Sequence, residues 1–189
     1  IHKAAAVVIG PGLGQEAGAE RLLDLVLQEA KKLPELPVVI DADGLNLLAK
    51  KRLYSTLGRQ YVLTPHLREM SRLSGKSVQE IADDMTSAVM GQQAGATIVL
   101  KDARTLVSDG DWLYINLSGN SALSTGGSGD VLSGMIGGLL AQGCTQRTAA
   151  TLAVYMHGLT ADQYCESAPP HCMLARDILE MIPKIGGNS

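Results

Sequence analysis

The sequence is poor in aromatic residues: they make up 3% of its 189 residues, and phenylalanine is absent. A core is still expected, because apolar residues reach 46% and the chain is long enough for one domain. Aliphatic side chains and methionine must fill that core. The net charge is −3 and no basic run occurs, which excludes the usual electrostatic pattern of a nucleic-acid-binding protein.

Cysteine is scarce, and long apolar runs are absent. Cys144, Cys165 and Cys172 show no CxxC spacing, which is typical of a reduced cytoplasmic protein. No run reaches transmembrane length and no signal peptide is visible, so we expect no membrane partner. An apolar segment begins by Ala4, only three residues after Ile1. We therefore expect an N-terminal truncation or a cleaved precursor.

Short apolar runs alternate with segments of helical spacing along the chain. The runs predict strands at residues 4–9, 37–41, 61–64, 96–101, 104–108 and 112–116, the last two joined by an Asp-Gly turn. Helices are predicted at residues 15–33, 45–51, 65–74, from 77 towards 94, and at 130–141, 146–166 and 174–182. Asp43, Thr64 and Ser77 are the expected N-caps of the second, third and fourth helices. This order predicts an α/β domain with a mostly parallel sheet covered on both faces.

The strongest chemical motif is the GGSGD segment at residues 126–130. Its glycines carry no Cβ, so backbone N–H groups can face a phosphate at the N-terminus of the following helix. Asp130 would repel a phosphate, but it suits a base that accepts a hydroxyl proton during phosphoryl transfer. The alternative is a tight turn in which Asp130 is only a helix cap.

A second glycine-rich loop, GPGLG at residues 10–14, follows the first predicted strand. Gly12, Gly14 and Ala17 loosely match the dinucleotide-binding fingerprint GxGxxA. The acidic residue that should follow about 20 residues later lies further away in this chain, at Asp41 or Asp43. A tight strand–helix turn explains the same glycines.

Several polar residues follow predicted strands, at the edge where α/β sheets bind ligands. Lys101 could neutralise phosphate charge or simply be solvated. His66 and Glu69 share a helix face, as a binding pair or as a polar pair near the cap. Asp41 and Asp43 could hold Mg²⁺ through water, with helix capping as the alternative for Asp43. His157 lies in the helix predicted at 146–166 and is interpreted as a residue at the edge of the core.

Taken in order, five segments resemble one known family. They read IGPGLG, IDADGLNLL, LTPHLREMSRL, VLKDARTLV and SGNSALSTGGSGDVLSG, and the match runs from Ala5 to about Pro183. This pattern resembles the ADP/ATP-dependent NAD(P)H-hydrate dehydratases of the ribokinase-like superfamily. The resemblance implies a ribokinase-like three-layer α/β/α fold with a mostly parallel central sheet, as one domain over residues 1–189 that lacks its N-terminal part.

The resemblance also implies an activity. The family restores NAD(P)H from its hydrate, NAD(P)HX, by phosphorylating the hydrate hydroxyl with ADP or ATP and eliminating phosphate, and Mg²⁺ is expected with the nucleotide. The implied protein is a cytoplasmic homo-oligomer with no nucleic-acid or membrane partner.

Site residues follow from the matched motifs. Asp130 corresponds to the catalytic acid that contacts and activates the hydrate. The implied nucleotide-binding residues are Lys101, Asp102, Ala103, Arg104, Thr105, Asn120, Ser124, Thr125, Gly126, Gly127, Ser128 and Gly129. The implied substrate-binding residues are Gly14, His66, Glu69, Arg72 and Asp130. No side chain is implied as a metal ligand.

The chain departs from the family pattern at three points. Asp102 stands where glycine usually follows the motif lysine, and Ser118 replaces the commoner threonine. The family's first elements, including a glycine- and alanine-rich helix beside the hydrate site, have no counterpart here. Three other functions stay open: a vitamin-precursor or sugar kinase of the same superfamily, a nicotinamide-binding Rossmann module or oxidoreductase, and an inactive fragment.

Overall fold

The computed structural model describes residues 1–91 and 94–185, which contain one six-stranded sheet. All six predicted strands are confirmed, each shorter than expected. They are β1 (Val7–Ile9), β2 (Val38–Ile40), β3 (Tyr61–Leu63), β4 (Thr97–Leu100), β5 (Leu106–Ser108) and β6 (Leu113–Ile115). The strands lie side by side in chain order. The pairs from β1 to β4 are parallel. Strand β5 pairs antiparallel with β4, and β5 and β6 form the predicted antiparallel hairpin.

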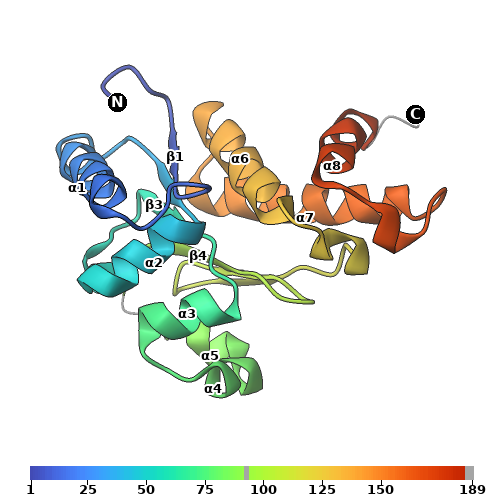
Figure 1. Cartoon of the computed structure of the whole chain (residues 1–189), viewed down its shortest axis with the longest axis horizontal. Coiled ribbons are helices and arrows are strands. Elements are labelled where there is room, and N and C mark those ends of the chain that lie inside the picture. The colour runs from blue at the N-terminus through green and yellow to red at the C-terminus, as the bar shows by residue number, and fades with distance from the viewer. Residues whose placement is uncertain (92–93, 186–189) are drawn as a thin grey trace.

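Helices cover both faces of this sheet and make the predicted three-layer arrangement (Figure 1). They are α1 (Ala17–Lys32), α2 (Ala42–Lys51), α3 (Leu67–Ser74), α4 (Val78–Asp83), α5 (Met85–Met90), α6 (Ser128–Ala141), α7 (Gln146–Tyr164) and α8 (Ala175–Met181). The alternating side chains of each strand separate the two faces. Val38 and Ile40 join the core under α1 to α5, whereas Val39 between them joins the core under α6 and α7.

The predicted start of α3 is wrong by two residues. Thr64 is not its N-cap: His66 holds that position, and its Nδ1 atom accepts hydrogen bonds from the backbone N–H of Arg68 and Glu69. The backbone of residues 64–66 instead continues along the sheet, where His66 forms a parallel bridge with Lys101. Strand pairing therefore prevails over the Thr-Pro helix-start signal.

Two further local predictions need correction. Asp43 does not cap α2, whose N-cap position is Asp41, because the Asp43 carboxylate binds another loop. The helix predicted from Ser77 towards Ala94 begins with the expected capping box but divides at Asp84, which caps α5. Residues 92–93 of that prediction lie outside the described part of the chain.

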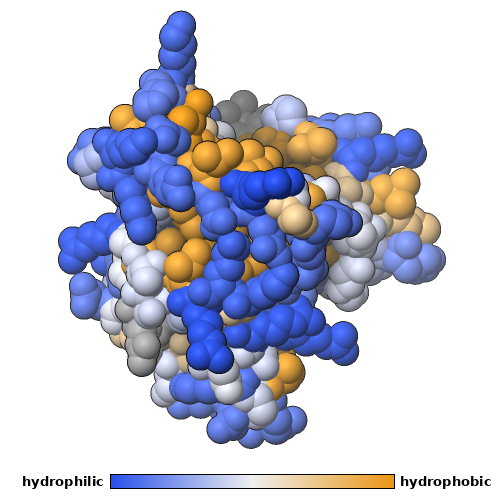
Figure 2. Space-filling model, turned by 60° about the vertical axis from the view of Figure 1, so that its left-hand side comes forward, coloured by the Kyte–Doolittle hydropathy of each residue, from blue (hydrophilic) through white to orange (hydrophobic). Residues whose placement is uncertain are grey.

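Strand β1 forms one edge of the sheet. Figure 2 brings this side of the molecule forward and shows apolar side chains gathered beneath the N-terminal segment. The exposed large apolar residues of β1 and α1 are Val8, Leu22 and Leu25. Within residues 1–91 and 94–185, no helix is both long and apolar enough to cross a membrane.

Candidate active site

The carboxyl ends of the four parallel strands meet at one edge of the sheet, as the topology requires. Gly10, Asp41, Thr64 and Lys101 each directly follow one of these strands. The first two are in very close contact: Gly10 has a φ of 126°, and a Cβ on it would lie 1.8 Å from the Asp41 carbonyl oxygen. Only glycine fits this position, so the glycine-rich loop after β1 is fixed against the start of α2.

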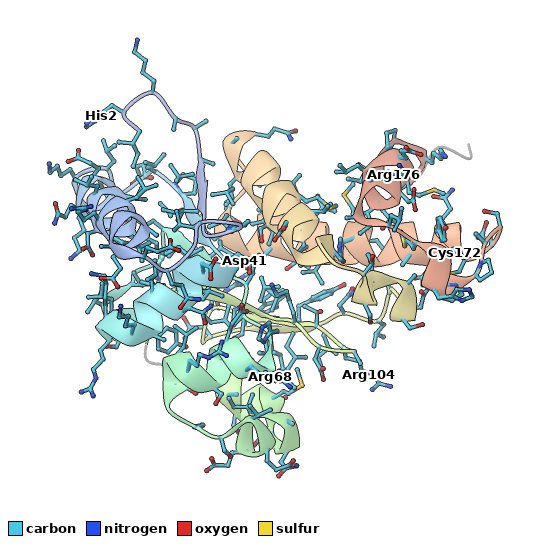
Figure 3. The ribbon with its side chains drawn as sticks, in the orientation of Figure 1. His2, Asp41, Arg68, Arg104, Cys172 and Arg176 are labelled. Carbon is cyan, nitrogen blue, oxygen red and sulfur yellow. The ribbon has the colours of Figure 1, made fainter. Side chains whose placement is uncertain are left out.

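A buried carboxylate lies at the centre of this edge (Figure 3). Asp41 is only 1% exposed, and its Oδ1 atom accepts a hydrogen bond from the Lys101 ammonium at 2.8 Å. Its Oδ2 atom accepts another from the Ser133 hydroxyl of α6 at 2.5 Å. The ion pair compensates the burial of the carboxylate and connects β2, β4 and α6 at one point.

The Lys101 ammonium also lies close to the glycine loop. A Cβ built on Gly129 would be 3.3 Å from Lys101 Nζ. Lys101 is therefore not simply solvated, which was the alternative left open by the sequence. Its position places one positive charge beside the first turn of α6, where a bound anion would be stabilised.

The first turn of α6 presents backbone donors without acceptors. Gly127 is the N-cap, in the left-handed conformation with a φ of 86°, and no side chain caps the helix. Within the described ranges, the N–H groups of Gly126, Gly127, Gly129 and Asp130 have no hydrogen-bond acceptor. A Cβ on Gly126 would meet nothing within 4 Å, so the space that these donors face is open. This combination suits a phosphate group.

Asp130 occupies the first turn of α6 but does not cap it. Its side chain is exposed, and it has no ion pair or side-chain hydrogen bond among residues 1–91 and 94–185. The carboxylate therefore remains available to a ligand. The capping role that the sequence left open for this residue is excluded by Gly127 in the cap position.

His66 and Glu69 are confirmed as neighbours, in a reciprocal capping box. Glu69 is buried and accepts a hydrogen bond from the His66 backbone N–H at 2.9 Å, while its other oxygen lies 3.4 Å from His66 Nε2. Burial is the main cause that lowers the pKa of His66, opposed by the negative charge of Glu69. Neutral imidazole suits this position because Nδ1 already accepts two backbone N–H groups.

The remaining implied substrate residues gather beside α2. Asp43 accepts hydrogen bonds from the Gly14 backbone N–H at 3.0 Å and from the Gln15 side chain at 2.8 Å. Arg72 of α3 donates to the Asn46 side chain at 2.8 Å. Gln15, Asn46 and Arg72 from these contacts border one cavity of about 500 Å³, which Ala49 and Lys50 also line. The structure thus brings Gly14 and Arg72 to the same side of the sheet edge.

The implied nucleotide segments lie in the loop after β4 and in the stretch that leads into α6. Residues 102–104 are exposed in the loop after β4, from which Arg104 projects (Figure 3). Thr105 accepts a backbone hydrogen bond from Asn116. Asn120 caps the short 3-10 helix Ser121–Ser124 and donates to the Asp162 carboxylate of α7 at 3.0 Å. Ser124 and Thr125 lead directly from this helix into the glycine loop.

The contacts of five residues of this region were not predicted from the sequence. Asn46 and Ser133 are polar residues inside helices, and only their position one turn from Asp43 and Gly129 signals a role. Asp162 and His157 are polar positions on α7. Asp41 was considered as a water-mediated metal ligand and as the acid of the dinucleotide-binding fingerprint, and the structure shows it as the partner of Lys101.

The fold and this site, with a glycine loop and an acidic residue at the start of a helix beside a mostly parallel sheet, define a ribokinase-like protein. A ribokinase-like protein from Enterococcus faecalis superimposes with a TM-score of 0.85 at 32% identity, covering 97% of this chain and 63% of that one. The family model described as NAD(P)H-hydrate dehydratase matches residues 1–184. The chain belongs to this family.

Named relatives agree with the family model. The ADP-dependent (S)-NAD(P)H-hydrate dehydratase of Neisseria meningitidis is 44% identical over 167 residues, which are 85% of this chain and 55% of that protein. The Bacillus subtilis ADP/ATP-dependent NAD(P)H-hydrate dehydratase, co-crystallised with ATP and Mg²⁺, superimposes with a TM-score of 0.83 at 30% identity, covering 99% of this chain and 66% of that one. The chain thus spans less than two thirds of these relatives.

Proposed function

We propose that this chain catalyses the ADP- or ATP-dependent dehydration of NAD(P)HX to NAD(P)H. The observation that carries the proposal is the pairing of four unoccupied N–H donors in the first turn of α6 with the ammonium of Lys101. This arrangement fits the phosphates of a nucleotide. Family membership and the named relatives favour the hydrate as the second substrate.

The residues divide into two groups around Asp130. Gly126, Gly127 and Gly129 would donate to phosphate oxygens, and Lys101 would balance their charge. On the other side, His66 and the Gly14 loop would contact the hydrate, with Arg72 and Glu69 completing the implied substrate-binding set. Asp130, exposed in the first turn of α6, would act between the two groups as the base for the hydrate hydroxyl.

The chemistry follows from this division. The nucleotide, when bound, would supply its terminal phosphoryl group to the hydroxyl of the hydrate and leave as AMP (from ADP) or as ADP (from ATP). The phosphorylated hydroxyl is a good leaving group. Asp130 accepts the proton of that hydroxyl, and the donors of α6 stabilise the negative charge on the transferred group. The lone pair of the ring nitrogen then expels phosphate from the neighbouring carbon, which leaves an iminium ion. Loss of a proton from the next ring carbon restores the carbon–carbon double bond of the reduced nicotinamide.

Mg²⁺ fits this site only together with the nucleotide. Within residues 1–91 and 94–185, no three His, Cys, Asp or Glu side chains are grouped to hold a metal. The exposed Asp130 carboxylate offers a single oxygen donor group beside the phosphate position. Mg²⁺ commonly binds through one or two carboxylates together with phosphate oxygens and water, so this donor set is sufficient.

The test is direct recovery of the reduced cofactor. The purified protein is incubated with NADHX, ADP or ATP, and Mg²⁺, and the absorbance of reduced nicotinamide is followed. We expect recovery only with nucleotide. No recovery, together with stable phosphorylation of a vitamin alcohol, would replace the proposal with the kinase alternative. Tight binding of unmodified NAD with no need for an adenosine phosphate would favour the Rossmann alternative.

We also propose that the protein is a cytoplasmic homo-oligomer. The exposed apolar side chains of β1 and α1, Val8, Leu22 and Leu25, support self-association. Cys144, Cys165 and Cys172 are all free, which suits a reducing compartment. Sedimentation velocity would reveal a monomer if the first inference is wrong, and cell fractionation tests the second.

A further inference from the structure

Helix α7 contacts the glycine loop through a buried histidine. His157 is 7% exposed, and its Nε2 atom lies 3.1 Å from the carbonyl oxygen of Ser128 and 3.1 Å from the Ser128 hydroxyl oxygen. Ser128 is the first residue of α6 and the centre of the GGSGD segment. A histidine 29 residues away in the chain therefore contacts the first turn of α6 directly.

The contact determines which nitrogen of the ring carries hydrogen. A carbonyl oxygen only accepts, so Nε2 must be protonated to bond the Ser128 carbonyl. Burial lowers the pKa of His157 to about 4, so the ring is neutral near pH 7 with this single hydrogen at Nε2. The same N–H points at the Ser128 hydroxyl oxygen, which must act as an acceptor towards His157.

The Ser128 hydroxyl therefore keeps its own hydrogen. Within the described ranges, no acceptor takes this hydrogen. It lies in the same turn as the open N–H groups of Gly127, Gly129 and Asp130. A hydroxyl that can no longer donate to His157 can donate to an anion bound at that turn.

The same face of α7 also fixes the preceding loop. Asp162 accepts hydrogen bonds from the Gly119 backbone N–H at 2.8 Å and from the Asn120 side chain at 3.0 Å. Gly158 packs so tightly on this loop that a Cβ would lie 2.7 Å from the carbonyl carbon of Ser118. The helix that carries His157 is thus held in a fixed position relative to the glycine loop.

We propose that His157 is a positioning residue for nucleotide binding, which orients the Ser128 hydroxyl and the first turn of α6 towards a phosphate oxygen. This inference rests on the proposed function, because it takes the anion to be the phosphate of ADP or ATP. It assigns His157 no contact with the nucleotide itself.

The test is the dissociation constant of ADP, measured by isothermal titration calorimetry on the purified protein. His157→Leu should weaken binding about tenfold, the value of one hydrogen bond to a charged group. His157→Gln places an amide N–H near the position of Nε2 and should restore binding to within about threefold of wild type. Thr160→Val is the control, because it removes another buried hydrogen bond of α7, from Thr160 Oγ1 to the His157 carbonyl, away from the loop.

Two results would overturn the assignment: unchanged ADP affinity in His157→Leu, or equal loss in Thr160→Val. Ser128→Ala gives an independent test that does not require the histidine variant to fold, and unchanged affinity there overturns the proposal too. The double variant combines Ser128→Ala with His157→Leu. If its loss of ADP affinity equals the product of the two single-variant losses, the residues act separately and the proposal is wrong. Absence of both ADP and ATP binding by the wild type would refute the proposed function itself.

Discussion

Replacing Lys101 by methionine should destabilise the protein by about 3 kcal/mol, because it leaves the Asp41 carboxylate without its ion-pair partner. Removing one partner of a buried ion pair typically costs about 3–5 kcal/mol. Two features place this case at the lower end. The Ser133 hydroxyl still donates to Asp41, and Lys101 is itself 21% exposed, so water can reach the vacated position. For a chain of this size the loss corresponds to roughly 6–12 °C in Tm.

The chain offers a matched control for this experiment. Lys51 bonds Asp24 at 2.9 Å and is 24% exposed, much like Lys101, but its partner carboxylate is 40% exposed instead of 1%. Lys51→Met should therefore cost no more than about 1 kcal/mol. Urea unfolding monitored by circular dichroism measures both variants. If the two variants lose equal stability, burial of the Asp41 carboxylate is not the source of the effect, and the reasoning fails.

Three further outcomes are expected. Asp130→Asn should retain ADP affinity but lose about 10²–10⁴-fold in turnover, and near-normal turnover would remove its role as a base. The pKa of His157 is lowered to about 4, so stability present above about pH 6.5 should be lost as the pH falls towards 4, by about 3 kcal/mol in total. Urea unfolding across this range should show a smaller loss for His157→Gln, and parallel curves would contradict the shift. Gly158→Ala should lower Tm despite the better helix propensity of alanine, since its Cβ would lie 2.7 Å from the backbone of Ser118. A raised Tm would show that the loop of Ser118 moves to make room for the methyl group.

Much of the fold could be predicted from the sequence, because the strands are short apolar runs that end at glycine or a polar residue. Val38 to Ile40, between Pro37 and Asp41, is such a run, and both cores receive its alternating side chains. The hairpin from β5 to β6 followed from the Asp109-Gly110 pair, since this dipeptide favours a tight turn. Local composition and turn chemistry were sufficient at these positions.

The helix starts were predicted less well, because tertiary contacts decide them. Asp43 has the sequence features of a cap, yet its carboxylate bonds Gly14, 29 positions away in the chain. Ala42 adopts a φ of 47°, a left-handed conformation that its side chain disfavours and that no sequence pattern indicates. Both residues lie where β2 passes into α2, at the sheet edge that carries the site.

The candidate site was only partly accessible to sequence reasoning. The glycine segment and Asp130 stood out because their residue types are unusual at the start of a helix. The Asp41–Lys101 pair joins residues 60 positions apart, and the pair of His157 with Ser128 joins residues 29 apart. Partners so distant in sequence leave no local pattern, so only the folded chain shows that they meet.

The absence of any side chain at Gly10 has a mechanical consequence for the whole sheet edge. Since the loop after β1 rests directly on the main chain of Asp41, the two segments cannot slide past each other and must shift as one piece. The loop that carries Gly14 and the segment of Asp41 are therefore joined by direct backbone contact as well as by the hydrogen bonds of Asp43. We expect a ligand that displaced either segment to move the other, because no side chain separates Gly10 from the Asp41 main chain.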